Sequence, residues 1–154
     1  MLFTGNDFVD TSSSFDTAMK AGSNGALFVR AYATSGALMG VPKPILWHGS
    51  GYAATALSAS IRGVLGIAND TVASGCVGWF QIRGYVADAQ GGATCFAGSY
   101  GHAVYWGGAT GLGCSSSAFT GISHMVAIMA EDVGGGSSTT ANIYLIGKLD
   151  ACAM

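Results

Sequence analysis

The chain has 154 residues, of which 9% are charged and 50% are hydrophobic, and its formal net charge is −2. This length suits one domain, which can bury enough apolar surface to fold without metal or disulfide staples. The six basic residues are scattered singly, which argues against nucleic-acid binding, because that function needs a clustered basic surface. With so little charge, much of the surface is expected to contact other protein.

No targeting or membrane segment is predicted. Residues 1–7 lack both the basic and the apolar region of a secretion signal. The apolar runs end well short of the roughly 18 residues that a membrane-spanning helix needs. We therefore expect synthesis in a cytoplasm, without export and without a membrane partner.

Residues 1–25 are polar, and phenylalanines are spaced through them at Phe3, Phe8 and Phe15. We predict an extended N-terminal arm whose aromatic side chains anchor it to its own domain or to a neighbour. The alternative is a disordered tail in which the phenylalanines are incidental.

Residues 26–154 have the pattern of a single β domain. Strand patterns separated by glycine-rich turns occur at 26–33, 52–57 and 102–106. The prolines Pro42 and Pro44 make residues 38–47 extended, but they exclude a central strand throughout this passage, because proline cannot donate to a sheet.

A strand–loop–strand unit occurs twice in the β domain. In the first copy, residues 64–84, an apolar run stops at Asn69 and Asp70, and a second strand is expected to end at Gly84. Residues 126–147 repeat this order. The loops are too short for a crossover helix, so we predict an all-β fold, a small antiparallel β-barrel or β-sandwich. A short helix at 123–131 is the alternative there, because Met and Ala favour helices.

Residue types that carry catalysis do not cluster in the sequence. The histidines His48, His102 and His124 show no metal-ligand spacing and no known catalytic motif. Residues 48–51 place a serine two positions from a histidine, which is poor geometry for a catalytic triad. Glu131 and Asp132 follow a strand as residues 69–70 do, which favours a turn over a catalytic carboxylate pair. We predict no enzymatic activity, no metal and no cofactor.

The four cysteines form no Cys-x-x-Cys pair and match no zinc pattern; they are Cys76, Cys95, Cys114 and Cys152. In a reducing cytoplasm we expect them to be thiols. Oxidation after release from a cell is the alternative, and the sequence does not choose among the possible pairings.

Two tryptophans, Trp47 and Trp106, are candidate partner-binding residues together with the three phenylalanines of the arm. Because aromatic faces stack on sugars, the three tryptophans Trp47, Trp79 and Trp106 could line a carbohydrate groove. The alternative is that they pack in the core or against another subunit.

The stretch Gly-Trp-Phe-Gln-Ile-Arg-Gly at 78–84 resembles the Gly-Trp-Val-Gln-Val-x-Gly strand of tailed-bacteriophage capsid decoration proteins, also called cement or head-stabilising proteins. In that family a Gly-Val-Ala run precedes the strand, matched here by Gly-Ile-Ala at 66–68. Residues 127–147 are similar to the family's closing Gly-x-Ala-x-Glu and Val-x-Val-x-Leu-x-Gly motifs. Ser99 stands where such proteins often have an acidic residue. The similarity covers residues 26–147.

This resemblance implies a structural virion protein that is made in the host cytoplasm and decorates the outer surface of an icosahedral phage head. Such proteins stabilise contacts between major capsid subunits, commonly as homotrimers. The expected partners are therefore the major capsid protein and further copies of the chain. The second hypothesis is a carbohydrate-binding or receptor-reading β module of a phage tail or cell surface.

Overall fold

The computed structural model describes residues 9–10, 18–47, 49–56, 64–91, 96–106, 112–113, 124–133 and 138–147. Within these residues the fold is all β apart from one short 3-10 turn, η2 (Ser23–Gly25), which confirms the predicted fold class. The strands are β1 (Val9–Asp10), β2 (Met19–Ala21), β3 (Leu27–Ala33), β4 (Pro42–Trp47), β5 (Tyr52–Ala54), β6 (Val64–Ala68), β7 (Val77–Gln90), β8 (Ala103–Trp106), β9 (Leu112–Gly113), β10 (His124–Met129) and β11 (Thr140–Ile146). In this part of the chain no helix is long and apolar enough to cross a membrane.

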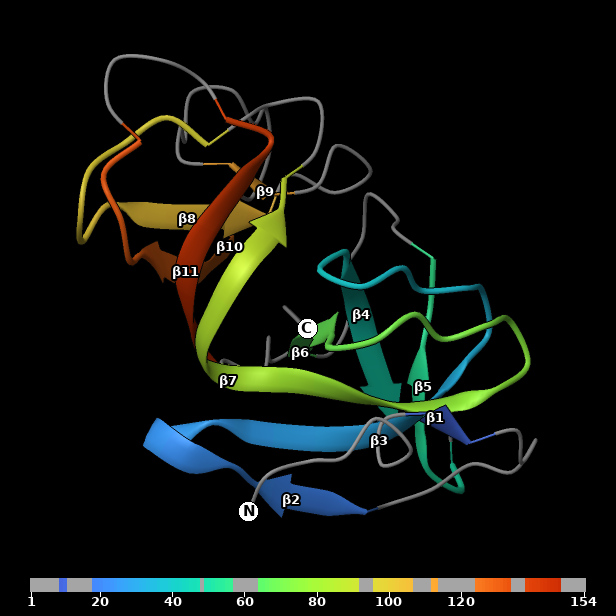
Figure 1. The fold of residues 1–154 in the computed structure, drawn as a ribbon. Coiled ribbons are helices and arrows are strands. Elements are labelled where there is room, and N and C mark those ends of the chain that lie inside the picture. Colours follow the sequence, from blue (N-terminus) through green and yellow to red (C-terminus); the bar gives the residue numbers. More distant parts are fainter. Residues whose placement is uncertain are drawn as a thin grey trace.

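A ring of five strands forms a closed β-barrel in the order β3, β5, β4, β6 and β7, and β7 pairs back to β3 (Figure 1). Neighbouring strands of the ring are antiparallel except β3 and β5, which are parallel. The chain passes from β3 to β4 across the position that β5 later fills, so β5 returns in the direction of β3. The predicted antiparallel barrel is therefore confirmed apart from this pair.

The two predicted hairpins are present, and they pair with each other. β6 and β7 are antiparallel, as are β10 and β11, and β11 lies antiparallel to the second half of β7. β8 and β9 extend this second sheet beyond β10. The helical alternative at 123–131 is wrong for β10, where the deeply buried Ala127 and Met129 alternate with the less buried Ile128, as in a strand.

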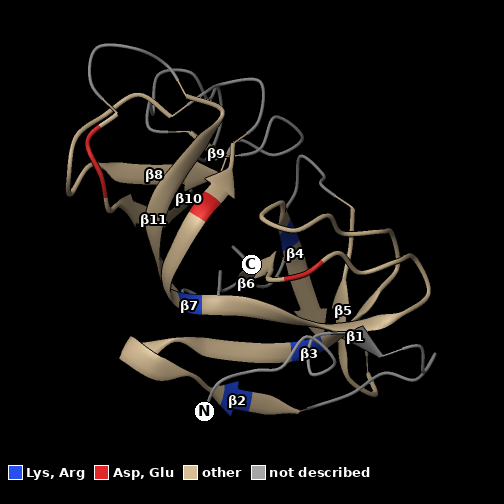
Figure 2. Cartoon of the chain, viewed as in Figure 1, with Lys and Arg blue, Asp and Glu red and all other residues tan. Residues whose placement is uncertain are grey.

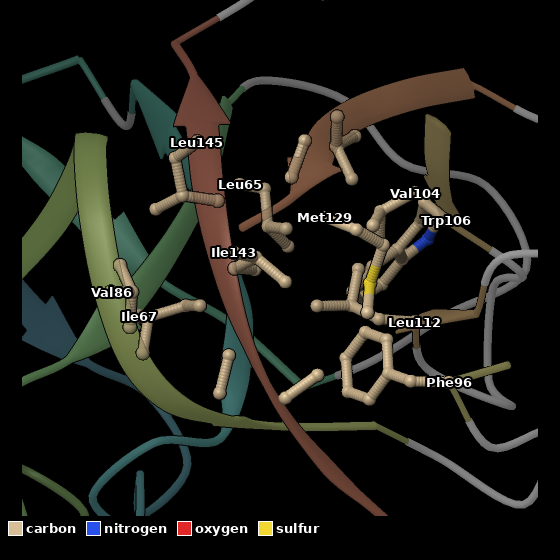
Figure 3. Packing of buried hydrophobic residues seen from close by; sticks show 14 residues of the cluster. Leu65, Ile67, Val86, Phe96, Val104, Trp106, Leu112, Met129, Ile143 and Leu145 are labelled. Atoms are coloured by element: carbon tan, nitrogen blue, oxygen red, sulfur yellow. The ribbon is translucent and has the colours of Figure 1, made fainter. Parts of the chain in front are cut away.

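β6 lies between two hydrophobic cores, and every one of its residues is buried. Val64 and Ala68 belong to the barrel core with Phe80. Leu65 and Ile67 belong to the second core, in which Figure 3 shows side chains from β6, β7 and β11 beside those of β8 to β10. Burial of apolar area contributes roughly 25 cal/mol per Å². Burial of β6 on both faces therefore stabilises the packing of the barrel against the second sheet.

The strand expected to end at Gly84 continues through a bend to Gln90. Gly84 has a φ of 96°, and a Cβ at this position would lie 2.8 Å from the Cα of Ala26, so only glycine fits without strain. β3 pairs with β7 up to Arg83, and β11 pairs with β7 from Arg83 onward. The pairing thus persists across the glycine, which is why this residue bends the strand instead of ending it (Figure 1).

β4 has two neighbours along only part of its length, and its prolines lie outside that part. Pro42 and Pro44 pair with β6, residues 46–47 pair with β5, and only Ile45 between them pairs with both strands. Proline lacks the N–H group that a second neighbour would accept, so it occurs where a strand has one partner. The expectation that residues 38–47 are not a central strand throughout is confirmed.

The described parts of the predicted N-terminal arm pair with the β domain itself. β1 pairs with β7, and β2 is antiparallel to β3, so both strands extend the same sheet. Residues 18–25 are therefore anchored on their own domain, one of the two arrangements expected for the arm. Phe3, Phe8 and Phe15 lie outside the described residues.

Candidate functional site

The two tryptophans predicted to bind a partner lie in different environments. Trp47, the last residue of β4, is 60% exposed, whereas Trp106, the last residue of β8, is 3% exposed. Trp106 packs in the second core, and among the described residues its indole Nε1 has no hydrogen-bond partner. Trp106 is thus a core residue and not a partner-binding one. Of these two tryptophans, only Trp47 is exposed to a partner in solvent.

Trp47 belongs to a surface cluster that the sequence did not reveal. The antiparallel pairing of β4 and β5 places Trp47 opposite Tyr52, and their rings meet edge to face, with centroids 5.4 Å apart and planes at 78°. The Tyr52 hydroxyl donates to Met19 Sδ at 3.8 Å, and Met19 is 49% exposed. We call these three residues the Trp47 patch. They come from β2, β4 and β5, so only the sheet topology brings them together.

Trp79 is buried, although β7 also carries exposed residues. It is 5% exposed, and Lys20 Nζ lies 4.5 Å from its ring centroid. This cation–π contact is worth about 0.5–1 kcal/mol at a partly exposed site and fastens β2 onto the barrel. Trp79 therefore has a packing role and not that of a binding platform.

The most exposed aliphatic side chains of the described residues lie in the tight turn between β3 and β4. Leu38 is 62% exposed and Met39 is 60% exposed. The turn closes through the N–H of Val41, which donates to the Leu38 carbonyl at 3.1 Å, and through Gly40, whose φ is 77°. We call residues 38–41 the apolar turn. The sequence pattern predicts an extended passage here, so the turn and its exposure were not expected.

Hydrogen bonds from two other segments hold the apolar turn in place. The N–H of Gly40 donates to the Ala68 carbonyl at 3.0 Å, and the N–H of Gln90 donates to the Gly40 carbonyl at 2.9 Å. The Gln90 side-chain amide donates to the Met39 carbonyl at 3.3 Å, while the Met39 N–H donates to Thr71 Oγ1 at 3.4 Å. The backbone is thus fixed against the ends of β6 and β7, although the two side chains face solvent.

The acidic residues after β6 and β10 accept hydrogen bonds, Asp70 within its own turn and Glu131 and Asp132 from other segments. Asp70 Oδ1 accepts the N–H of Thr71 at 2.7 Å, which supports its predicted role in the turn. Glu131 accepts two bonds from Asn142, at 2.7 Å from the backbone N–H and at 2.9 Å from the side-chain amide. Asp132 Oδ1 instead accepts from Ser99 Oγ at 3.4 Å. The two adjacent carboxylates therefore bind different partners and do not act as a pair at one point.

His102 makes hydrogen bonds with Ser99, three residues earlier in the chain. Its Nδ1 accepts the N–H of Ser99 at 3.3 Å. His48, the histidine of the 48–51 fragment, and the side chain of His124 lie outside the described residues. Among the described residues, no group of three His, Cys, Asp or Glu side chains could hold a metal ion.

Cys76 is a free thiol, whereas the other three cysteines fall outside the described ranges.

Lys43 is a buried cation on β4. Its side chain is 9% exposed, and Nζ donates to Ser35 Oγ at 3.2 Å. Burial lowers the pKa of Lys43 below its ordinary value of 10.5, because desolvation disfavours the charged ammonium group. One hydroxyl is a weak partner for such a charge, so Lys43 reduces the stability of the barrel in its protonated form.

No protein-family model matches the chain, and no significant match occurs among curated proteins or solved structures. Function is therefore inferred from the described surface and from the short motifs. Charged residues are few over most of the ribbon in Figure 2, so the surface features that stand out are apolar or aromatic. These are the apolar turn, the Trp47 patch and the exposed tyrosines of the second sheet.

Proposed function

We propose that the chain is a structural virion protein, not an enzyme, which binds the outer surface of an icosahedral phage head after synthesis in the host cytoplasm. The observation that carries this proposal is the apolar turn, with Leu38 62% exposed and Met39 60% exposed on a fixed backbone. Large apolar side chains on a preorganised turn lose little conformational entropy on docking, so they suit an apolar pocket of a protein partner.

The resemblance of residues 78–84 to decoration proteins supports the same proposal. In this chain these residues lead into the bend at Gly84, the point at which the barrel meets the second sheet. The motif therefore has a structural role here, as expected of a stretch that specifies a fold.

The proposed partners are the major capsid protein and further copies of the chain. We propose a homotrimer that stabilises contacts between neighbouring capsid subunits. Three linked copies engage several head sites at high effective concentration, so each apolar turn needs to contribute only a modest affinity. This arrangement suits a chain in which 9% of residues are charged, because few ion pairs are then available to strengthen one contact.

Binding to heads of the virus that encodes the chain tests the proposal. Heads made without the chain are mixed with purified protein and sedimented. We expect the wild-type chain to sediment with the heads, and the double variant Leu38→Ser/Met39→Ser to bind at least about tenfold more weakly. Tyr100→Ser is the matched control, because Tyr100 is 70% exposed on a different turn. A wild-type chain that stays in the supernatant would overturn the proposal.

A second candidate function, carbohydrate binding, is favoured by the Trp47 patch. Trp47 is 60% exposed and has Tyr52 edge-on beside it, so a sugar could stack on its free face. Trp79 and Trp106, the other tryptophans considered for stacking on a sugar, are buried and are not part of this candidate site. A glycan array distinguishes the candidates, because specific glycan binding that is lost in Trp47→Ala favours the carbohydrate module. The leading proposal instead expects no glycan signal.

A further inference from the structure

A second exposed surface lies on the outer face of the ladder between β7 and β11. Tyr85 and Tyr144 face each other across the two strands, and Arg83 and Ile146 form the next pair. Tyr85 is 49% exposed and Tyr144 is 36% exposed, and Arg83 is also exposed. The alternate residues of both strands point into the second core. We call Arg83, Tyr85, Tyr144 and Ile146 the tyrosine–arginine platform.

The backbone beneath the platform is fixed. Gln81 is 4% exposed, and its Nε2 donates to the carbonyls of Arg83 at 3.0 Å and Tyr85 at 2.8 Å. These bonds satisfy two carbonyls at the bend of β7 and hold the residues on either side of Gly84 in position. The platform is thus part of a paired, internally braced strand and not of a loop.

Two glycines also leave space for the platform side chains. A Cβ on Gly147 would lie 3.2 Å from Arg83 Cβ, and a Cβ on Gly25 would lie 3.5 Å from the Tyr144 hydroxyl. The Arg83 stem therefore lies close over the Gly147 backbone, and the Tyr144 ring reaches across to η2. The absence of a side chain at these two positions thus leaves room for Arg83 and Tyr144 on this face.

The polar ends of the platform have no partner among the described residues. In the described ranges, the Arg83 guanidinium has no ion pair, and neither the Tyr85 nor the Tyr144 hydroxyl has a hydrogen bond. Tyrosine and arginine are the residue types most enriched at the energetic centres of protein interfaces. A guanidinium beside two phenols suits a carboxylate that is surrounded by uncharged protein surface.

We propose that this platform is a second contact with the head, and that it recognises a carboxylate of the capsid subunit. The inference rests on the proposed head-binding function and adds the chemistry of the partner surface. A nucleic-acid strand is a poor occupant, because the platform offers one cation where a phosphate backbone needs several. A sugar is also disfavoured, since Tyr144 is only 36% exposed, which leaves little of its ring for stacking.

Head binding by variants of the platform tests this inference. We expect Arg83→Glu to weaken head binding by about tenfold or more and Arg83→Lys to weaken it less. The double variant Tyr85→Ala/Tyr144→Ala should weaken head binding as much as Arg83→Glu does. Raising the salt concentration should weaken binding of the wild type more than that of Arg83→Ala, since the variant lacks the ion pair. Tyr100→Ala serves as the exposed-tyrosine control and should bind as the wild type does.

Unfolding midpoints of all variants show whether a loss of binding reflects the contact or the fold. Wild-type binding together with unchanged binding of Arg83→Glu and of the double tyrosine variant would overturn the inference and leave the proposed function standing. A wild-type chain that does not bind heads would overturn both. Binding that is lost in folded platform variants and kept in Tyr100→Ala would support both.

Discussion

Glu131 binds Asn142 at two points, with Oε1 accepting the backbone N–H at 2.7 Å and Oε2 accepting the side-chain amide at 2.9 Å. Asn142 Oδ1 in turn accepts the N–H of Asp88 at 3.1 Å. Asp88 has a φ of 51° and lies where the register of β7 against β11 shifts, at a β-bulge opposite Asn142. One carboxylate therefore braces the hairpin β10–β11 and, through Asn142, its contact with β7.

Removing the Glu131 carboxylate should destabilise the second sheet. We expect Glu131→Ala to lower the free energy of unfolding by about 2–3 kcal/mol, because two partly buried donors of Asn142 lose a charged acceptor. Glu131→Gln keeps one carbonyl oxygen and should have a smaller effect. Urea unfolding followed by tryptophan fluorescence measures both. An unfolding free energy of Glu131→Ala within about 0.5 kcal/mol of the wild type would contradict this role.

Gly84 should tolerate a side chain much less well than another glycine with positive φ. Gly84→Ala places a Cβ 2.8 Å from Ala26 Cα. At Gly101, with a φ of 80°, no atom of the described residues other than its chain neighbours lies within 4 Å of the position that a Cβ would take. We expect Gly101→Ala to cost about 1 kcal/mol, the penalty of the backbone conformation, and Gly84→Ala to cost about 3 kcal/mol or more. Equal losses in denaturant unfolding would show that the bend is not sterically restricted.

Replacing Lys43 by methionine should stabilise the protein at neutral pH. The pKa of folded Lys43 lies below 10.5, because burial disfavours the charge, so the unfolded chain binds more protons between the two pKa values. Stability of the wild type should therefore rise with pH across that interval. Lys43→Met removes the buried charge and should raise the free energy of unfolding by about 0.5–2 kcal/mol at pH 7.

The pH dependence provides the control for this substitution. The difference between Lys43→Met and the wild type should narrow as the pH approaches 10.5, because Lys43 is then increasingly neutral in both states. Other groups that titrate at alkaline pH are common to the two proteins and cancel in the difference. A constant difference across the alkaline range would show that the gain comes from packing and not from the charge.

Local patterns in the sequence were sufficient to predict the hairpins. Residues 64–84 and 126–147 each contain two apolar, strand-forming runs separated by a short turn, so each pair of strands is encoded by neighbouring residues. Closure of the barrel through β3 and β7, and the parallel pair β3–β5, depend on residues distant in the chain. No local pattern specifies them. For the same reason, the continuation of β7 through Gly84 was missed.

The surface was less predictable than the strands. Trp47 and Trp106 both end strands, and only their neighbours in space make one 60% exposed and the other 3% exposed. The apolar turn was overlooked because its exposure depends on hydrogen bonds from Thr71 and Gln90, which come from other segments. Tyr85 and Tyr144 become a pair only when β11 adds to β7.

Whether the chain decorates the outer surface of a phage head can be seen by cryo-electron microscopy of heads from the virus that encodes it. Heads made with and without the gene are reconstructed in the same way and compared. We expect added density on the outer shell, accommodating the barrel and second sheet and bridging capsid subunits, which disappears when the gene is deleted. Identical shells with and without the gene would contradict the proposed function.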